Sequence, residues 1–195
     1  MKELFQVCAG AWDQAGASEL HDLIGAIETA QQCKGAGVPE HLQGDFHSAL
    51  ENMTVFPDLK QQLMHKGEQL HWSEGSMKMP DSFRGRFAYV ELAGPKGMLH
   101  HSDVSFGFYL QQSDTVYPNH WHEAVEHYLI LSGTADWQMD TARFEPRRPG
   151  SLFVHTSNQR HATTTWLEPL LAMWFWRGNI SDATYRIDGV KGLNA

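Results

Sequence analysis

Apolar side chains in the first third of the chain recur at the spacing of a helix. After Ser18, a residue type favoured at helix N-caps, they predict a helix over 19–33 that ends at two nearby glycines. A second helix is expected after Pro39, a third over 57–70, and a short initial one over 3–14. The two clearest stripes are formed by Leu20, Leu23, Ile24 and Ile27, and by Leu42, Phe46, Leu50 and Met53.

Beyond residue 70 the pattern changes to short runs of β-branched and aromatic residues. Turn signals such as Ser132-Gly133 and Pro149-Gly150 separate some of them. Short strands at this spacing predict a sandwich or barrel. We therefore expect a helical region over 1–70 packed on a β-barrel over 71–195. The predicted strands cover 87–92, 105–110, 128–131, 135–139, 151–154 and 170–176.

Composition narrows the class of protein. The chain has 195 residues, of which 42% are hydrophobic, and this suits one compact domain with a real core. Its net charge of -8 and the lack of a basic block argue against a nucleic-acid partner. Without a signal-peptide pattern or a long apolar window, a cytoplasmic protein with no membrane span is expected. Cys8 and Cys33 are expected to be reduced packing residues.

A concentration of potential metal ligands lies between residues 117 and 161. His120 and His122 are two apart, so in a strand both side chains share a face, and the same holds for Glu126 and Tyr128. Imidazole and carboxylate together suit first-row divalent metals. His161 is the best distant candidate to complete the set. His155 and His127 are the rival ligands, although His127 points away from Glu126 if the segment is extended.

The spacing of these residues resembles a known pair of motifs. His120, His122, Glu126 and Gly133 stand at the spacing of the first cupin motif, and the segment 150–161 resembles the second. Asp114 stands where the first motif usually opens with glycine, and Ser151 replaces the usual aspartate of the second. The resemblance implies a mainly β fold: the cupin double-stranded β-helix, a jelly-roll barrel, here with an N-terminal α-helical region.

Two tyrosines extend the first motif to Tyr-x-x-His-x-His-x-x-x-Glu-x-Tyr, from Tyr117 to Tyr128. Over about residues 70–180 the chain resembles the cupin-type dimethylsulfoniopropionate (DMSP) lyases, which form dimethyl sulfide and acrylate. The resemblance implies a catalytic Tyr117 and a pocket walled in part by Trp174 and Trp176. It also implies that the metal ligands are His122, Glu126, Tyr128 and His161, with His120 a ligand or a substrate-binding neighbour.

Elimination from such a sulfonium carboxylate needs electron withdrawal at the carboxylate and a base at the adjacent carbon. A divalent metal ion supplies the first. A nearby cation also favours the phenolate of a tyrosine, so Tyr117 or Tyr128 is a candidate base. Aromatic faces can hold the sulfonium end by cation–π attraction. The ligand types suit one ion, Zn²⁺ or Fe²⁺, and also fit Mn²⁺, Co²⁺ or Ni²⁺.

Other functions stay open at this point, because a cupin barrel alone does not name a reaction. An Fe(II) dioxygenase acting on a small thiol or acid would need oxygen for turnover. A non-catalytic ligand-binding cupin would tolerate loss of Tyr117. A sugar isomerase or epimerase usually uses a lysine or histidine base. The exposed helical face makes a homodimer possible.

Overall fold

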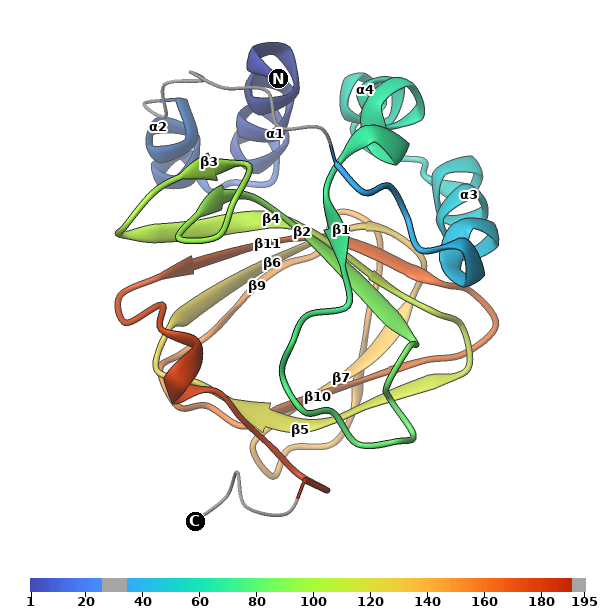
Figure 1. Ribbon diagram of the computed structural model, residues 1–195, viewed down its shortest axis with the longest axis vertical. Helices are drawn as coiled ribbons and strands as arrows, with labels where there is room; N and C mark the ends of the chain where they lie inside the picture. Colours follow the sequence, from blue (N-terminus) through green and yellow to red (C-terminus); the bar gives the residue numbers. More distant parts are fainter. Residues whose placement is uncertain (26–34, 191–195) are drawn as a thin grey trace.

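The computed structural model describes residues 1–25 and 35–190, in which two β-sheets face each other and helices cover the outer face of the larger sheet (Figure 1). The helical segments are α1 (Lys2–Gln14), α2 (Ser18–Gly25), η1 (Glu40–Leu42), α3 (Gln43–Asn52), α4 (Pro57–Lys66), η2 (Gly67–Gln69) and η3 (Asp182–Thr184). The strands are β1 (Trp72–Ser73), β2 (Phe87–Gly94), β3 (Leu99–His100), β4 (Val104–Gln111), β5 (Thr115–Trp121), β6 (Val125–Ser132), β7 (Ala135–Met139), β8 (Glu145–Arg147), β9 (Leu152–His155), β10 (His161–Thr165), β11 (Leu170–Arg177) and β12 (Arg186–Ile187).

The order of the strands defines the topology. The larger sheet runs β1-β2-β4-β11-β6-β9, with β3 beside β2, and the smaller sheet runs β12-β5-β10-β7-β8. From β4 to β7, and again from β9 to β11, successive strands alternate between the two sheets. This is the winding of a jelly roll. The expected mainly β barrel with an N-terminal helical region is confirmed.

The helical predictions agree with the structure where the residues are described. The segments expected over 3–14 and after Pro39 correspond to α1 and α3. Of the helix expected over 19–33, α2 covers the first part, and 26–34 lies outside the described residues. The helix expected over 57–70 ends earlier, at Lys66, and continues as the 3-10 turn η2.

All six predicted strands are present, but β5 was not among them. This strand contains Pro118, which cannot donate a ladder hydrogen bond and is tolerated in sheets mainly at edges and bulges. The register of β5 against β10 shifts here: His120 pairs with His161, and Tyr117 pairs with Thr163. One extra residue of β5 therefore forms a bulge. As a result Tyr117 and His120, three apart, both point into the barrel and stack at a ring-centroid distance of 3.8 Å.

The central strands of the larger sheet are buried on both faces. On β11, Met173 and Phe175 belong to the hydrophobic cluster shared with the helices, whereas Ala172 and Trp174 belong to the cluster inside the barrel. The same alternation holds on β4 and β6. A strand covered on both faces reads as a continuous apolar run, as β11 does from Leu170 to Trp176. The helices therefore pack on the outer face of the larger sheet, and the side chains of its inner face line the interior of the barrel.

The first cysteine of the chain, Cys8, is a fully buried free thiol in the helical cluster, as expected for a packing residue. Cys33 lies outside the described residues. The expected boundary near residue 70 falls between η2 and β1. Across residues 1–25 and 35–190, we find that every helix is too short or too polar to cross a membrane.

Candidate metal centre

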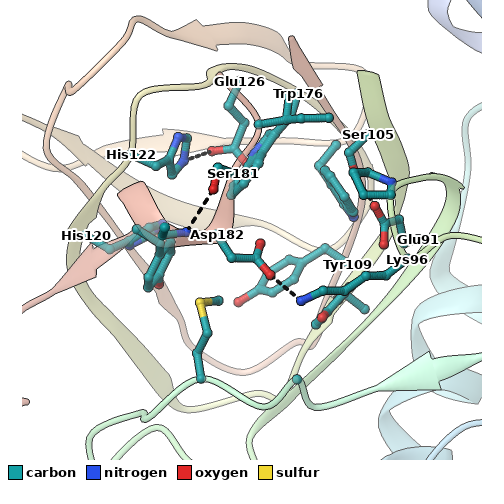
Figure 2. Close-up of a pocket in the computed structure, with 18 of the residues that line it drawn as sticks. Glu91, Lys96, Ser105, Tyr109, His120, His122, Glu126, Trp176, Ser181 and Asp182 are labelled. Atoms are coloured by element: carbon teal, nitrogen blue, oxygen red, sulfur yellow. Dashed lines mark hydrogen bonds and ion pairs between the residues drawn. The ribbon is translucent and has the colours of Figure 1, made fainter. Parts of the chain in front are cut away.

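Three side chains from three strand ends converge inside the barrel. His122 follows the end of β5, Glu126 lies near the start of β6, and His161 is the first residue of β10. The Nε2 atoms of His122 and His161 lie 3.4 Å and 3.3 Å from Oε2 of Glu126. One ligand atom from each residue lies within 4.8 Å of the others, and all three side chains are buried. Figure 2 shows His122 and Glu126 on one wall of the cavity.

The hydrogen bonds of this trio leave one atom of each residue directed at a common point. The Nδ1 atom of His122 bonds the carbonyl of Ala124 at 3.0 Å, and that of His161 bonds the carbonyl of Gln159 at 2.8 Å. Each ring therefore carries its proton on Nδ1 and presents an unprotonated Nε2. Both Nε2 atoms and Glu126 Oε2 are buried without a hydrogen-bond partner. Since buried polar atoms are rarely left unpaired, two imidazoles and one carboxylate fit a divalent transition-metal ion.

The other oxygen of Glu126 is held by a tryptophan. Trp176 donates its Nε1 proton to Oε1 at 2.6 Å, and its ring also packs on His122 at a centroid distance of 4.2 Å. Burial by itself would raise the pKa of the Glu126 carboxyl, but when the rings of His122 and His161 carry a proton toward it, their hydrogen bonds and charge outweigh burial and hold that pKa well below its usual range. The carboxylate is therefore ionised and oriented, as a ligand needs to be.

Two further predicted site residues, His120 and Tyr117, form a stack beside the trio. The ring of His120 lies between Tyr117 and His161, with centroid distances of 3.8 Å and 4.0 Å, and its Nδ1 bonds the carbonyl of Pro118. Burial, followed by the neighbouring His161, holds the pKa of His120 well below its usual value. His120 lines the cavity but stands outside the trio.

Tyr185 is the neighbour of Tyr117 that sequence reasoning missed. The two hydroxyl oxygens lie 2.5 Å apart. Tyr185 follows η3 near the end of the described chain, far from either motif, and no spacing pointed to it. Burial raises the pKa of Tyr117, and the hydrogen bond with Tyr185 acts in the opposite direction. Tyr185 is thus placed to orient the Tyr117 hydroxyl and to stabilise its ionised form.

Tyr128 and the two predicted tryptophans also face the cavity. Tyr128 is buried against Trp137, at a centroid distance of 4.7 Å. Burial and then the negative charge of Glu126 raise the pKa of Tyr128 well above its usual value. Trp174 and Trp176 both line the cavity, and Trp174 donates its Nε1 proton to the carbonyl of Phe108 at 3.2 Å.

The rival histidines lie elsewhere. His155 is fully buried and stacks on His161 at a centroid distance of 3.9 Å, but it does not belong to the trio or line the cavity. His127, next to Glu126 in β6, turns to the opposite face of the sheet and packs against Phe175 in an edge-to-face contact. This is the orientation expected for an extended segment.

The departure from the first motif at Asp114 has a backbone explanation. Asp114 has φ +48°, the left-handed region for which glycine is usual and aspartate is tolerated. Gly133, at the other end of the motif, has φ +78°, and a Cβ there would collide with the carbonyl of Pro169. Both turns therefore keep the geometry of the motif.

His122 and Glu126 of the trio line a cavity of about 650 Å³, a volume typical of small-molecule sites. Its walls come from both sheets, from the segment after β2 and from the segment after β11. The inner lining is aromatic, and acidic groups are placed at several points: Glu74, Glu91, Glu126 and Asp182.

A jelly-roll barrel with two histidines and a glutamate inside it defines a cupin with a candidate metal site. Within that class, the profile of the family described as dimethylsulfoniopropionate lyase matches residues 21–172. The chain therefore belongs to the DMSP lyase family, and the resemblance noted in the sequence is confirmed.

Individual relatives agree with this assignment. The chain is similar to the DMSP lyase DddQ of Ruegeria pomeroyi, with 30% identity over 135 residues, 67% of this chain and 66% of that protein. It is also similar to the candidate DMSP lyase DddL of Cereibacter sphaeroides, with 32% identity over 113 residues, 57% of this chain and 47% of that protein. The matches thus span about half to two thirds of these relatives.

A solved chain from the crystal structures of the DMSP lyases RdDddP and RnDddQII shares the fold. The TM-score is 0.68 at 23% identity, covering 95% of this chain and 97% of that chain.

Proposed function

We propose that this protein is a metal-dependent lyase that cleaves dimethylsulfoniopropionate into dimethyl sulfide and acrylate. The observation that carries the proposal is the trio of His122, Glu126 and His161, two members of which, His122 and Glu126, line the same cavity as Tyr117 and Tyr185 with their paired hydroxyls. Membership of the DMSP lyase family supports the substrate.

The residues that would hold the ion are His122, Glu126 and His161, with Tyr128 and His120 as the further candidates. Bound there, a divalent ion, Zn²⁺ or Fe²⁺ with Mn²⁺, Co²⁺ or Ni²⁺ as alternatives, would withdraw electron density from the substrate carboxylate. Trp176 keeps Glu126 in place through its hydrogen bond.

We assign the base to Tyr117. Its phenolate oxygen would take the proton from the carbon next to the carboxylate, the electron pair of that C–H bond would form the new C=C bond, and the C–S bond would break. Dimethyl sulfide leaves with the bonding electrons as a neutral molecule, so no general acid is needed. Tyr185 supports this role because its hydroxyl can donate to the Tyr117 oxygen at 2.5 Å.

Tyr128 is the alternative base, but its surroundings favour a ligand role. The Glu126 charge lies beside its hydroxyl and, after burial, is the main cause that raises its pKa. A like charge disfavours a phenolate at this position. Tyr128 would therefore need the ion itself as a partner. The Glu126 charge also raises the pKa of Tyr117, but there it is a smaller cause than the hydrogen bond with Tyr185, which lowers that pKa.

The test is a headspace assay for dimethyl sulfide, with acrylate measured in parallel, on purified protein given Zn²⁺ or Fe²⁺. Both products should form in equal amounts, chelation should abolish them, and removal of oxygen should leave them unchanged. Absence of both products with every metal tried would remove the lyase proposal. A requirement for oxygen would instead identify a dioxygenase. Homodimer formation and a cytoplasmic location stay predictions of the sequence.

A further inference from the structure

A carboxylate on the inner face of the larger sheet has no role in the metal centre. Glu91 of β2 lines the cavity and is half-buried. Ser105 donates its hydroxyl proton to Oε1 of Glu91 at 2.6 Å. Burial is the main cause that raises the pKa of Glu91. Among the described residues, no lysine, arginine or histidine forms an ion pair with it. The ionised form of Glu91 is thus disfavoured in the empty cavity, and a cationic ligand beside it would favour that form.

The neighbouring charges do not neutralise Glu91. Lys96 is the only lysine or arginine among the described residues that line the cavity, and it bonds Asp182 at 2.6 Å. Glu74, another acid of the lining, faces His41 at 3.3 Å. Glu126 belongs to the metal centre. Lys96 does support Glu91 through its charge and a backbone hydrogen bond, but it forms its ion pair with Asp182. Figure 2 shows Glu91 beside Ser105 and Lys96, across the cavity from His122.

Two aromatic rings stand next to Glu91 on the same wall. Tyr89 lies two residues before it in β2 and meets Trp174 with a ring-centroid distance of 6.4 Å and an interplanar angle of 76°. Two rings nearly at right angles form a corner. The Nε1 proton of Trp174 is used by the Phe108 carbonyl, so the ring contacts a ligand through its apolar surface. A corner of aromatic faces beside a carboxylate suits a bulky cation.

The metal centre and Glu91 are connected across one sheet. Glu126, Trp176 and Ser105 are paired in turn across β6, β11 and β4, and Ser105 bonds Glu91. Two strand spacings, about 10 Å between backbones, therefore separate Glu126 from the residue that holds Glu91. A sulfonium propionate has six heavy atoms along its length, as two residues of extended chain do, and spans about 7 Å, so it can lie along this wall.

We propose that Glu91, with the rings of Tyr89 and Trp174, binds the positively charged end of the substrate, a sulfonium or another onium group. The inference rests on the proposed function for the orientation of the ligand, with its carboxylate toward the trio. It adds that the protein selects carboxylates with an onium group at the other end over carboxylates of the same shape whose other end is uncharged. Association of the cation with Glu91 also supplies the ion-pair partner that this half-buried carboxylate lacks among the described residues.

The test compares two ligands that differ only in charge. Isothermal titration of the Zn²⁺-loaded protein uses two carboxylates of the same shape. One is 3-(trimethylammonio)propionate, with a cationic end, and the other is 4,4-dimethylpentanoate, in which an uncharged tert-butyl group replaces that end. The wild type should bind the cationic ligand more tightly. Glu91→Gln should lower the ratio of the affinity for the onium ligand to the affinity for 4,4-dimethylpentanoate about tenfold, the equivalent of about 1.4 kcal/mol. Binding of 4,4-dimethylpentanoate itself should change little.

A matched control removes the same charge elsewhere. Asp81 is 92% exposed and pairs with Arg84 outside the cavity, so Asp81→Asn should keep the wild-type ratio. The proposal is overturned if the wild type has no preference for the cation, if Glu91→Gln weakens both ligands equally, or if Asp81→Asn lowers the ratio as much.

The assay for dimethyl sulfide separates this inference from the proposed function. Onium preference without dimethyl sulfide release would end the lyase proposal and leave the Glu91 site in place. Release of dimethyl sulfide without onium preference would do the reverse.

Discussion

The hydrogen bond from Trp176 to Glu126 should decide how tightly the protein holds its metal ion. Trp176→Phe removes the Nε1 donor that lies 2.6 Å from Oε1 while keeping an aromatic ring against His122. A hydrogen bond to a charged acceptor contributes about 1.5–3 kcal/mol. At about 1.4 kcal/mol per factor of ten, the dissociation constant should rise roughly 10- to 100-fold. Loss of a partner that orients a metal ligand typically has this size of effect.

The chain offers a close control in Trp174. It lies on the same strand and the same inner face, but its Nε1 donates to the carbonyl of Phe108. Trp174→Phe should therefore leave metal affinity within about twofold. Competition of each variant with a chromophoric Zn²⁺ chelator gives the dissociation constants, and thermal unfolding of the metal-free forms gives the general loss of packing.

Two results would refute this reasoning. If Trp176→Phe binds Zn²⁺ as tightly as the wild type, the hydrogen bond does not support the ligand. If both variants weaken binding to the same degree, the effect comes from the packing of the β11 face.

Three further predictions test the site. His161→Ala should lose bound metal whereas His155→Ala should keep it, as measured by elemental analysis after dialysis; the opposite result would make His155 the ligand. Tyr117→Phe should abolish turnover at normal metal content, and Tyr185→Phe should lower kcat about tenfold because it removes one hydrogen bond to a charged oxygen; full activity of Tyr117→Phe would exclude it as the base. The pKa of Glu91 is raised mainly by burial, so folding favours its protonated form. The free energy of unfolding should therefore decline as the pH rises from the ordinary pKa of a glutamate through the raised pKa of Glu91 in the folded protein. Glu91→Gln should lack this decline in denaturant titrations across that range, and an unchanged pH profile would contradict the assignment.

The sequence named a larger set of candidate ligands than the trio: His120, His122, Glu126, Tyr128 and His161, chosen from two motifs with fixed spacing. Of these, the structure brings together His122, Glu126 and His161. Alternation in an extended strand also turned His127 away from Glu126, and His127 packs on the opposite face. Side-chain direction in a regular strand depends only on backbone geometry, so the direction of His127 follows from spacing alone.

Features that depend on irregular backbone or distant contacts were not predictable in the same way. The stack of Tyr117 on His120 exists only because β5 bulges near Pro118, and a regular strand would place these rings on opposite faces. Proline inside a strand was the available signal. Tyr185 reaches Tyr117 across 68 positions of sequence. A single tyrosine outside both motifs forms no sequence pattern from which its contact with Tyr117 could be predicted.

The double burial of the larger sheet limits how far this protein can be shortened. A truncated chain that begins at β1 would present to water the outer residues of β6 and β11, among them Leu129, Leu131, Met173 and Phe175, each at 0% exposure in the whole protein. An uncovered apolar face of this kind promotes self-association. The same strands carry Glu126 and Trp176 on their other side. The candidate metal site and the helical layer therefore depend on the same two strands, and a change to one of them has to be checked for its effect on the other.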